Sequence, residues 1–178
     1  FADRAAFLGD ADVVDVPTQR LISPEYARVL ARRIDPRKTR PLKAYGRHMP
    51  ADDSGTSHFS IIDRHGNAVA CTETINSVFG SLVVEPKYGI VLNNEMDDFA
   101  TNPGKPNQFG LVQGAYNAVV PGRRPLSSMC PVIVVKNGKV DAVVGSPGGP
   151  TILTTVLQVL LHRYEFGMDP LTAVAAPR

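Results

Sequence analysis

The chain has 178 residues, 43% of them hydrophobic and 20% charged, and its formal net charge is +2. This length and balance are typical of one globular domain with a buried core. The small net charge gives no electrostatic reason to expect nucleic acid as a partner, and no apolar run is long enough to span a membrane.

The two ends of the sequence indicate a piece of a longer protein. The first twenty residues lack the basic flank, the apolar run and the small-residue cleavage site of a signal peptide. The chain begins with Phe1 instead of Met and stops abruptly after Arg178. We therefore expect it to be a section of a larger sequence.

Residues 1–55 form a loop-rich, helical part. Ser23 before Pro24 is a good helix start, because serine caps the first turn and proline fits the first helical position. We expect this helix to run to about Ile34 and to end before an Asp-Pro pair. Residues 49–55 are polar and rich in chain breakers, which predicts an exposed, mobile loop.

From residue 56 the pattern changes to strands. Turn signals between apolar runs predict hairpins over residues 58–72 and 131–145, and residues 89–92 predict one more short strand. Apolar residues recur at helical spacing over residues 150–164, and a last helix starts at residues 169–170. Hairpins with a helix packed on them predict an α+β layered domain.

Two cysteines, Cys71 and Cys130, are too few for a disulfide framework and lack the spacing of a metal site. Both have apolar or small residues around them in the sequence. We therefore expect them to be buried packing thiols, and they leave the redox compartment open.

Several segments carry chemistry or are simply turns. Gly55-Thr56 places a hydroxyl after a flexible glycine at the mouth of a strand, although threonine is also an ordinary strand former. Residues 93–99 gather acids and amides at the end of an apolar strand, which fits an amine or cation site as well as a solvated turn. The spacing excludes an EF-hand calcium loop.

Residues 145–150 form a glycine-rich turn that leads into a helix. Such a turn can hold an anion or an oxyanion with free N–H groups, or it can be a tight strand-to-helix connection. His58 could serve as a base for Thr56, but no carboxylate is placed to orient its ring. We favour a structural role for His58.

The order of five blocks resembles the γ-glutamyltransferase (γ-glutamyltranspeptidase) family of N-terminal-nucleophile hydrolases. These blocks are GTSHFSIIDRHGNAV, TETINSVFGS, GIVLNNEMDDF, RPLSSMCPVIVV and GSPGGPTILTTVLQ. The resemblance implies an α+β fold with an αββα sandwich, of which this chain is a part. Residues 1–55 would be the C-terminal part of the large subunit, and residues 56–178 the small, catalytic subunit without its C-terminal end.

The resemblance also implies that a precursor cuts itself between Gly55 and Thr56. The Thr56 hydroxyl would attack the Gly55 carbonyl, and water would release the resulting ester. The freed α-amine has a reference pKa of roughly 8, so it can then act as the general base. By the same resemblance, Thr74 would orient the nucleophile, and the N–H groups of Gly148 and Gly149 would bind the tetrahedral oxyanion.

The substrate residues carried over from the family recognise an amino acid. Asn76, Glu95 and Asp98 would bind the α-amino group of a γ-glutamyl donor, and Ser127 and Ser128 its α-carboxylate. Glutathione is the typical donor, and water, an amino acid or a dipeptide would accept the acyl group. The resemblance implies no metal and no cofactor.

The sequence departs from the family at a few places. Ser57 stands where a second threonine is common. Residues 100–112 resemble a lid loop, but Phe109 replaces a tyrosine that in some members bonds to the asparagine matching Asn76, so this latch bond would be missing. The arginine that clamps the substrate carboxylate lies earlier in the family's large subunit, outside this sequence.

The resemblance implies the remainder of the large subunit as a partner and a place in the periplasm, on the cell surface or in the secreted fraction. Two alternatives stay open: a related acylase for cephalosporins or glutaryl amides, and an unprocessed, inactive fragment. The preferred acceptor, the balance between transfer and hydrolysis and the oligomeric state are also open.

Overall fold

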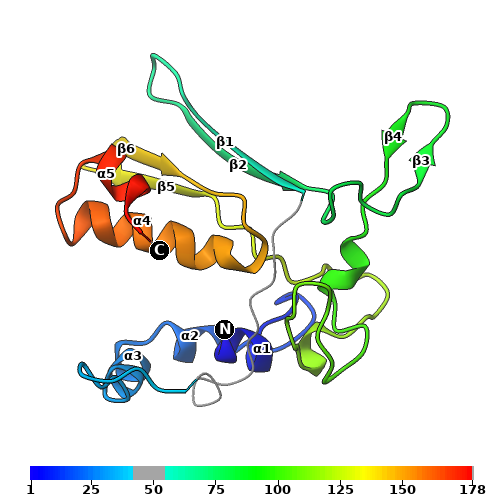
Figure 1. Cartoon of the computed structure of the whole chain (residues 1–178), viewed down its shortest axis with the longest axis horizontal. Helices are drawn as coiled ribbons and strands as arrows, with labels where there is room; N and C mark the ends of the chain where they lie inside the picture. Colours follow the sequence, from blue (N-terminus) through cyan, green and yellow to red (C-terminus); the bar gives the residue numbers. More distant parts are fainter. Residues whose placement is uncertain (42–54, 178) are drawn as a thin grey trace. The chain divides into compact units, whose positions relative to one another are not determined.

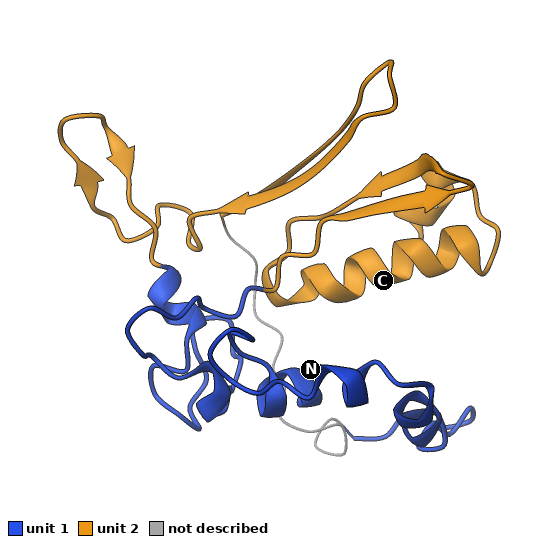
Figure 2. Ribbon diagram, turned by 180° about the vertical axis from the view of Figure 1, so that it is seen from behind, with its two compact units in different colours: residues 1–50, 95–127 blue, residues 51–94, 128–178 orange. Residues whose placement is uncertain are grey.

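The computed structural model describes residues 1–41 and 55–177, which divide into two compact units (Figure 2). Unit 1 consists of residues 1–50 and 95–127, and unit 2 of residues 51–94 and 128–178. Most of the exposed loop expected at residues 49–55 lies outside the described residues, and only Gly55 at its end is described.

Unit 1 is built from short helices and loops around a small apolar core. The side chains of Phe99, Ala100, Phe109 and Leu111 are buried there. Its helices, in chain order, are α1 (Ala2–Phe7), α2 (Thr18–Leu21), α3 (Pro24–Ala31) and the 3-10 turns η2 (Glu95–Asp98) and η3 (Ala115–Asn117).

Helix α3 begins where the sequence predicts and ends earlier than expected. The Ser23 hydroxyl accepts the N–H of Tyr26 at 3.1 Å, and Pro24 occupies the first helical position. The helix ends at Ala31 and not at Ile34, because the N–H of Ile34 bonds to the carbonyl of Ala31, three residues back. This tighter turn closes the helix.

Unit 2 holds all the strands of the described residues, paired as three antiparallel, two-stranded sheets (Figure 1). The first sheet has seven-residue strands, and Thr56 of β1 lies opposite Thr74 of β2. The elements of unit 2 are β1 (Thr56–Ile62), β2 (Ala68–Thr74), β3 (Val84–Glu85), β4 (Ile90–Val91), β5 (Val132–Lys136), β6 (Lys139–Val144), η4 (Gly149–Thr151), α4 (Ile152–Tyr164) and α5 (Pro170–Ala175).

Helix α4 runs along the β5–β6 hairpin in both ribbon views (Figures 1 and 2). Its buried side chains are Ile152 and Val156, and Ala173 of α5 is buried as well. The Tyr164 hydroxyl donates to a carboxylate oxygen of Asp141 at 2.6 Å, which ties the end of α4 to β6. Helices and strands together confirm the α+β class, and the four-layered sandwich stays a prediction.

The two cysteines are less buried than the sequence predicts. Both are free thiols in the described part of the chain, and each is only half-buried. Cys71 lies opposite Phe59 in the β1–β2 pair, and the Phe59 side chain is itself 43% exposed. The expectation of buried thiols was therefore wrong. For Cys71 the reason is that this face of the hairpin is only partly covered.

Neither residues 1–41 nor residues 55–177 contain a helix that is both long and apolar enough to cross a membrane.

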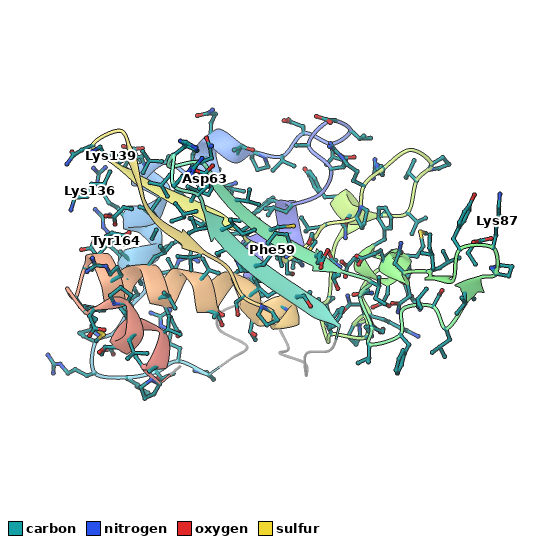
Figure 3. All side chains as sticks on the ribbon, turned by 90° about the horizontal axis from the view of Figure 1, so that it is seen from above. Phe59, Asp63, Lys87, Lys136, Lys139 and Tyr164 are labelled. Atoms are coloured by element: carbon teal, nitrogen blue, oxygen red, sulfur yellow. The ribbon has the colours of Figure 1, made fainter. Side chains whose placement is uncertain are left out.

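The turn of the β5–β6 hairpin should depend on its glycine. Asn137 and Gly138 have φ of 53° and 76°, the conformation of a type I′ turn, and Lys136 and Lys139 flank them (Figure 3). A Cβ at Gly138 meets nothing within 4 Å, so Gly138→Ala would add backbone strain without a clash. We expect it to lower the free energy of unfolding by about 1 kcal/mol in urea denaturation.

Asn137→Gly is the matched control in the same turn. It relieves a positive φ at a side-chain-bearing residue, so we expect a change below about 0.5 kcal/mol. Equal losses from both variants would contradict the conformational explanation.

Candidate active site

A chain of hydroxyl groups joins Thr56 to the carbonyl before it. The Thr56 hydroxyl donates to Oγ1 of Thr74 at 3.2 Å, and the Thr74 hydroxyl donates to the carbonyl oxygen of Gly55 at 3.1 Å. The backbone N–H of Asn76 also donates to Oγ1 of Thr74, at 2.9 Å. One hydroxyl has one donor and two acceptor sites, so Thr74 satisfies all three bonds at once.

This arrangement can support an attack of Thr56 on the Gly55 carbonyl. The Thr74 hydroxyl polarises that carbonyl and can accept the proton that the nucleophile loses. Gly55 has φ of 93°, and a Cβ there would lie 2.6 Å from the carbonyl oxygen of Ser77. The peptide before Thr56 is therefore packed closely against the backbone of Ser77, and only glycine fits without displacement.

Asn76 is fixed by a second polar network. It is 4% exposed and has φ of 76°, which is rare for a residue with a side chain. Its side-chain amide donates to the carbonyl of Asn94 at 3.1 Å. The Asn94 side chain in turn accepts the N–H of Ser77 at 3.0 Å and donates to its hydroxyl at 2.9 Å. Sequence reasoning gave Asn94 no such role, although it belongs to the polar segment that was singled out.

His58 has the geometry of a structural residue. Its ring nitrogens lie 2.8 Å from the hydroxyl of Thr72 and 2.9 Å from the hydroxyl of Ser60. The ring also packs directly on Gly145, where an added Cβ would lie 2.0 Å from it. Both nitrogens are thus engaged away from Thr56, which supports the structural role favoured from the sequence.

The glycine-rich turn lies before η4 and α4, as expected. Gly148 has φ of 136° and Gly149 φ of 49°, and the carbonyl of Gly148 accepts both the N–H and the hydroxyl of Thr151. Backbone N–H groups at the start of a helix have no intrahelical partner. Those of Gly148 and Gly149 can therefore stabilise a developing negative charge.

In unit 1 the two predicted acids flank one 3-10 turn. Burial raises the pKa of Asp98 to about 7, with a further rise from the carboxylate of Glu95, while Arg4 lowers it. Burial also raises the pKa of Glu95. Desolvation disfavours the charged form of both carboxyl groups, so both would gain from a bound ammonium group.

The other predicted residues of unit 1 lie in loops. Ser127 is exposed, and Phe109 is buried in the apolar core. The Asn107 side chain holds the loop around Phe109 by accepting the N–H groups of Phe109 and Leu111 at 3.0 Å each. A lid function of this loop stays a prediction.

The predicted site residues are thus divided between the two units. The structure brings Gly55, Thr56, Thr74 and Asn76 together in unit 2, and it brings Glu95 and Asp98 together in unit 1. Ser128, Gly148 and Gly149 belong to unit 2, and Phe109 and Ser127 to unit 1. Their assembly into a single site stays a prediction.

Three comparisons with known proteins all point to the same family. The sequence matches the gamma-glutamyltranspeptidase family over residues 1–178. It is 48% identical to the glutathione hydrolase proenzyme of Escherichia coli (strain K12), over 100% of this chain and 31% of that protein. The chain therefore spans about a third of the length of this relative.

Two further proteins are similar. The putative inactive glutathione hydrolase 4 of Arabidopsis thaliana is 46% identical over 96% of this chain and 92% of its own length. A crystal structure of a mutant Helicobacter pylori gamma-glutamyltranspeptidase superposes with a TM-score of 0.66 at 55% identity, over 68% of this chain and 65% of that chain.

Thr74→Val tests the hydroxyl chain directly. Valine keeps the shape of threonine but can neither polarise the Gly55 carbonyl nor accept from Thr56, so we expect cleavage before Thr56 to slow at least about a hundredfold. Thr74→Ser keeps the hydroxyl and should cleave within about tenfold of the wild-type rate. Time-resolved gel analysis of the full-length protein measures both, and normal cleavage in Thr74→Val would remove Thr74 from the reaction.

Proposed function

We propose, since the chain belongs to the gamma-glutamyltranspeptidase family, that the protein carrying it is a self-cleaving γ-glutamyltransferase and glutathione hydrolase. The observation that carries the proposal is the hydrogen-bonded series from Thr56 through Thr74 to the carbonyl of Gly55. In this proposal Thr56 is the nucleophile, Thr74 accepts its proton, and the carbonyl of Gly55, polarised by Thr74, is attacked.

The first reaction is the cleavage itself. Oγ1 of Thr56 bonds to the carbonyl carbon of Gly55, its proton passes to Thr74, and the Thr74 proton passes to the carbonyl oxygen. Collapse of this intermediate breaks the peptide C–N bond, and the leaving nitrogen takes up a proton to become the amine of Thr56. Water then hydrolyses the ester and leaves a carboxylate on Gly55.

The second reaction uses the same threonine on a substrate. The free amine of Thr56 has a reference pKa of roughly 8 and accepts the proton of its own hydroxyl. The N–H groups of Gly148 and Gly149 stabilise the oxyanion, a contribution of about 3 kcal/mol per donor. As the donor's amide C–N bond breaks, the leaving amine takes the proton held by the Thr56 amine, and the γ-glutamyl group remains as an ester on Thr56. This ester then passes the group to water, an amino acid or a dipeptide.

Recognition of the donor is assigned to the polar residues of both units. Asn76, Glu95 and Asp98 bind its α-amino group, and Ser127 and Ser128 bind its α-carboxylate. The partial desolvation of Glu95 and Asp98 supports this assignment, because an ammonium group would stabilise their charged forms. Glutathione is the expected donor, and no metal or cofactor takes part.

We infer the αββα sandwich as the architecture of the whole protein, with residues 1–55 ending the large subunit and residues 56–178 in the small subunit. The partner is then the remainder of the large subunit. Large apolar side chains support this, because Ile34, Leu82 and Leu171 are 73%, 81% and 78% exposed in this chain. A location in the periplasm, at the cell surface or in the secreted fraction remains our prediction.

A second candidate function is an uncut, inactive chain. The Arabidopsis relative at 46% identity is named a putative inactive glutathione hydrolase. An acylase for cephalosporins or glutaryl amides has weaker support, because the paired acids of η2 suit a donor with an α-amino group.

Thr56→Ala decides whether the chain is processed. Mass spectrometry of the full-length protein should find a subunit that begins at Thr56, whereas Thr56→Ala should stay intact because it lacks the attacking oxygen. Hydrolysis of γ-glutamyl-p-nitroanilide should fall at least about a thousandfold. An intact wild type without turnover would favour the inactive chain, and an active Thr56→Ala would refute the mechanism.

The half-buried acids Glu95 and Asp98 predict a pH dependence of donor binding. The pKa of Asp98 is raised to about 7, so its carboxylate is present above that pH and becomes protonated as the pH falls through it. The KM for γ-glutamyl-p-nitroanilide should therefore rise below pH 7, by about tenfold per pH unit. Glutaryl-p-nitroanilide lacks the amine, so its KM should not show this rise, and parallel curves would contradict the assignment.

A further inference from the structure

Helix α1 carries a buried arginine that the proposed mechanism does not use. The Arg4 residue is 8% exposed, and a guanidinium nitrogen donates to the carbonyl of Leu126 at 3.0 Å. Burial lowers its pKa and the charge of Asp98 raises it, but an arginine at this site remains a cation. A buried cation is costly unless it is paired, so its position is constrained by what it contacts.

The Asn117 side chain links Asp98 to Leu126 through hydrogen bonds. It is 1% exposed, and its amide donates to the carbonyl of Asp98 at 2.7 Å and to the side chain of Gln113 at 2.6 Å. Its oxygen accepts the N–H of Leu126 at 3.1 Å. Gln113 also donates to the carbonyl of Asp98, at 2.9 Å.

Side chains therefore hold both backbone groups of Leu126. Asn117 also bonds to the Asp98 carbonyl, and the charge of Arg4 acts on the Asp98 carboxylate. Asn117 holds the N–H and Arg4 holds the carbonyl, and the next residue in the chain is Ser127. In the proposed function Asp98 binds the α-amino group of the donor and Ser127 its α-carboxylate. These two groups are substituents of one carbon atom, so the spacing of their binding residues must be accurate.

We propose that Arg4 and Asn117 are positioning residues for donor recognition, which set the spacing between Asp98 and Ser127. Neither is assigned a contact with substrate. The inference rests on the proposed function, because the spacing matters only if these two residues bind one amino acid.

Arg4 also acts on the Asp98 carboxylate through its charge, which the neutral Asn117 side chain cannot do. The charged groups that face Asp98 are Glu95 and Asp97 of η2 and Arg4 of α1. Arg4 alone among these three is cationic and opposes the two carboxylates. Its removal should raise the pKa of Asp98 further, so that donor binding is lost at a higher pH than in the wild type.

The test uses Arg4→Met in the full-length protein, with γ-glutamyl-p-nitroanilide as the donor. We expect cleavage before Thr56 to proceed, KM to rise at least about tenfold and kcat to change less than about threefold. The rise of KM on acidification should begin at higher pH. The preference for the γ-glutamyl over the glutaryl anilide should fall by about the same factor as KM rises.

Three variants serve as comparisons. Asn117→Ala should raise KM without moving the pH at which KM begins to rise, since it removes a hydrogen-bonding group and no charge. Arg4→Lys keeps the charge but not the guanidinium, so KM should rise less and the pH response should stay near that of the wild type. Arg163→Met removes another arginine bonded to a backbone carbonyl, that of Met168 at 3.2 Å, and should leave all parameters unchanged.

An Arg4→Met enzyme with lower kcat but unchanged KM, pH response and donor preference would overturn the inference, because a merely structural residue behaves in that way. If Arg4→Met cannot be obtained folded, Arg4→Lys decides: a raised KM supports the inference and an unchanged KM overturns it. A wild-type protein that cleaves and turns over only the glutaryl anilide would instead refute the proposed specificity, and with it the inference.

Discussion

The candidate site depends on the hydrogen bonds of the Thr74 hydroxyl with Thr56 and with the carbonyl of Gly55. The position of this hydroxyl depends on the register of one hairpin. Thr56 meets Thr74 only because β1 and β2 pair in that register, and a slip by one residue would turn the Thr74 side chain to the other face. The turn that sets the register is closed by Asp63, whose carboxylate accepts the N–H groups of His65 at 2.8 Å and Asn67 at 2.9 Å. The Asn67 side chain holds the pKa of Asp63 below its usual range, so this turn carries its charge throughout the neutral range. A turn at the far end of the hairpin thus determines which groups meet at Thr56.

The predicted site residues of the two compact units differ in whether they carry charge. In unit 2 the predicted site groups are neutral hydroxyls and amides. Strand pairing and the hydrogen bonds of Asn76 and Asn94 hold them in place. In unit 1 the two predicted acids, Glu95 and Asp98, are ionisable and half-buried, so their charge state matters as well as their position. Arg4 contributes to both, because it offsets the carboxylates near Asp98 and bonds to the carbonyl of Leu126. A change at Arg4 therefore alters charge and position in unit 1 together.

Local signals in the sequence predicted several elements but not α1, α2 or β3. They did not predict the contacts that join distant residues. Ser23 and Pro24 predicted the start of α3, and the turn at Asn137-Gly138 predicted the second hairpin, because capping and turn preferences act within a few residues. Resemblance to a family assigned Thr56 and Thr74. No local pattern reveals that Arg4 bonds to a carbonyl 122 residues later. Partial exposure of the cysteines could not be predicted either, because it depends on what covers a strand face and not on the residues beside it.

The uncut chain gives a reason why one site can perform two reactions in sequence. In the proposed cycle the carbonyl of Gly55 occupies the place, next to the Thr74 hydroxyl, that a donor carbonyl would later need. The close approach of Gly55 to the backbone of Ser77 holds it there without a side chain of its own. In that cycle the shift to an ester creates the amine of Thr56, and hydrolysis of the ester then removes the carbonyl and frees the Thr74 hydroxyl. We expect the precursor to be inactive on external donors, because in this proposal its own peptide is bound as the first substrate.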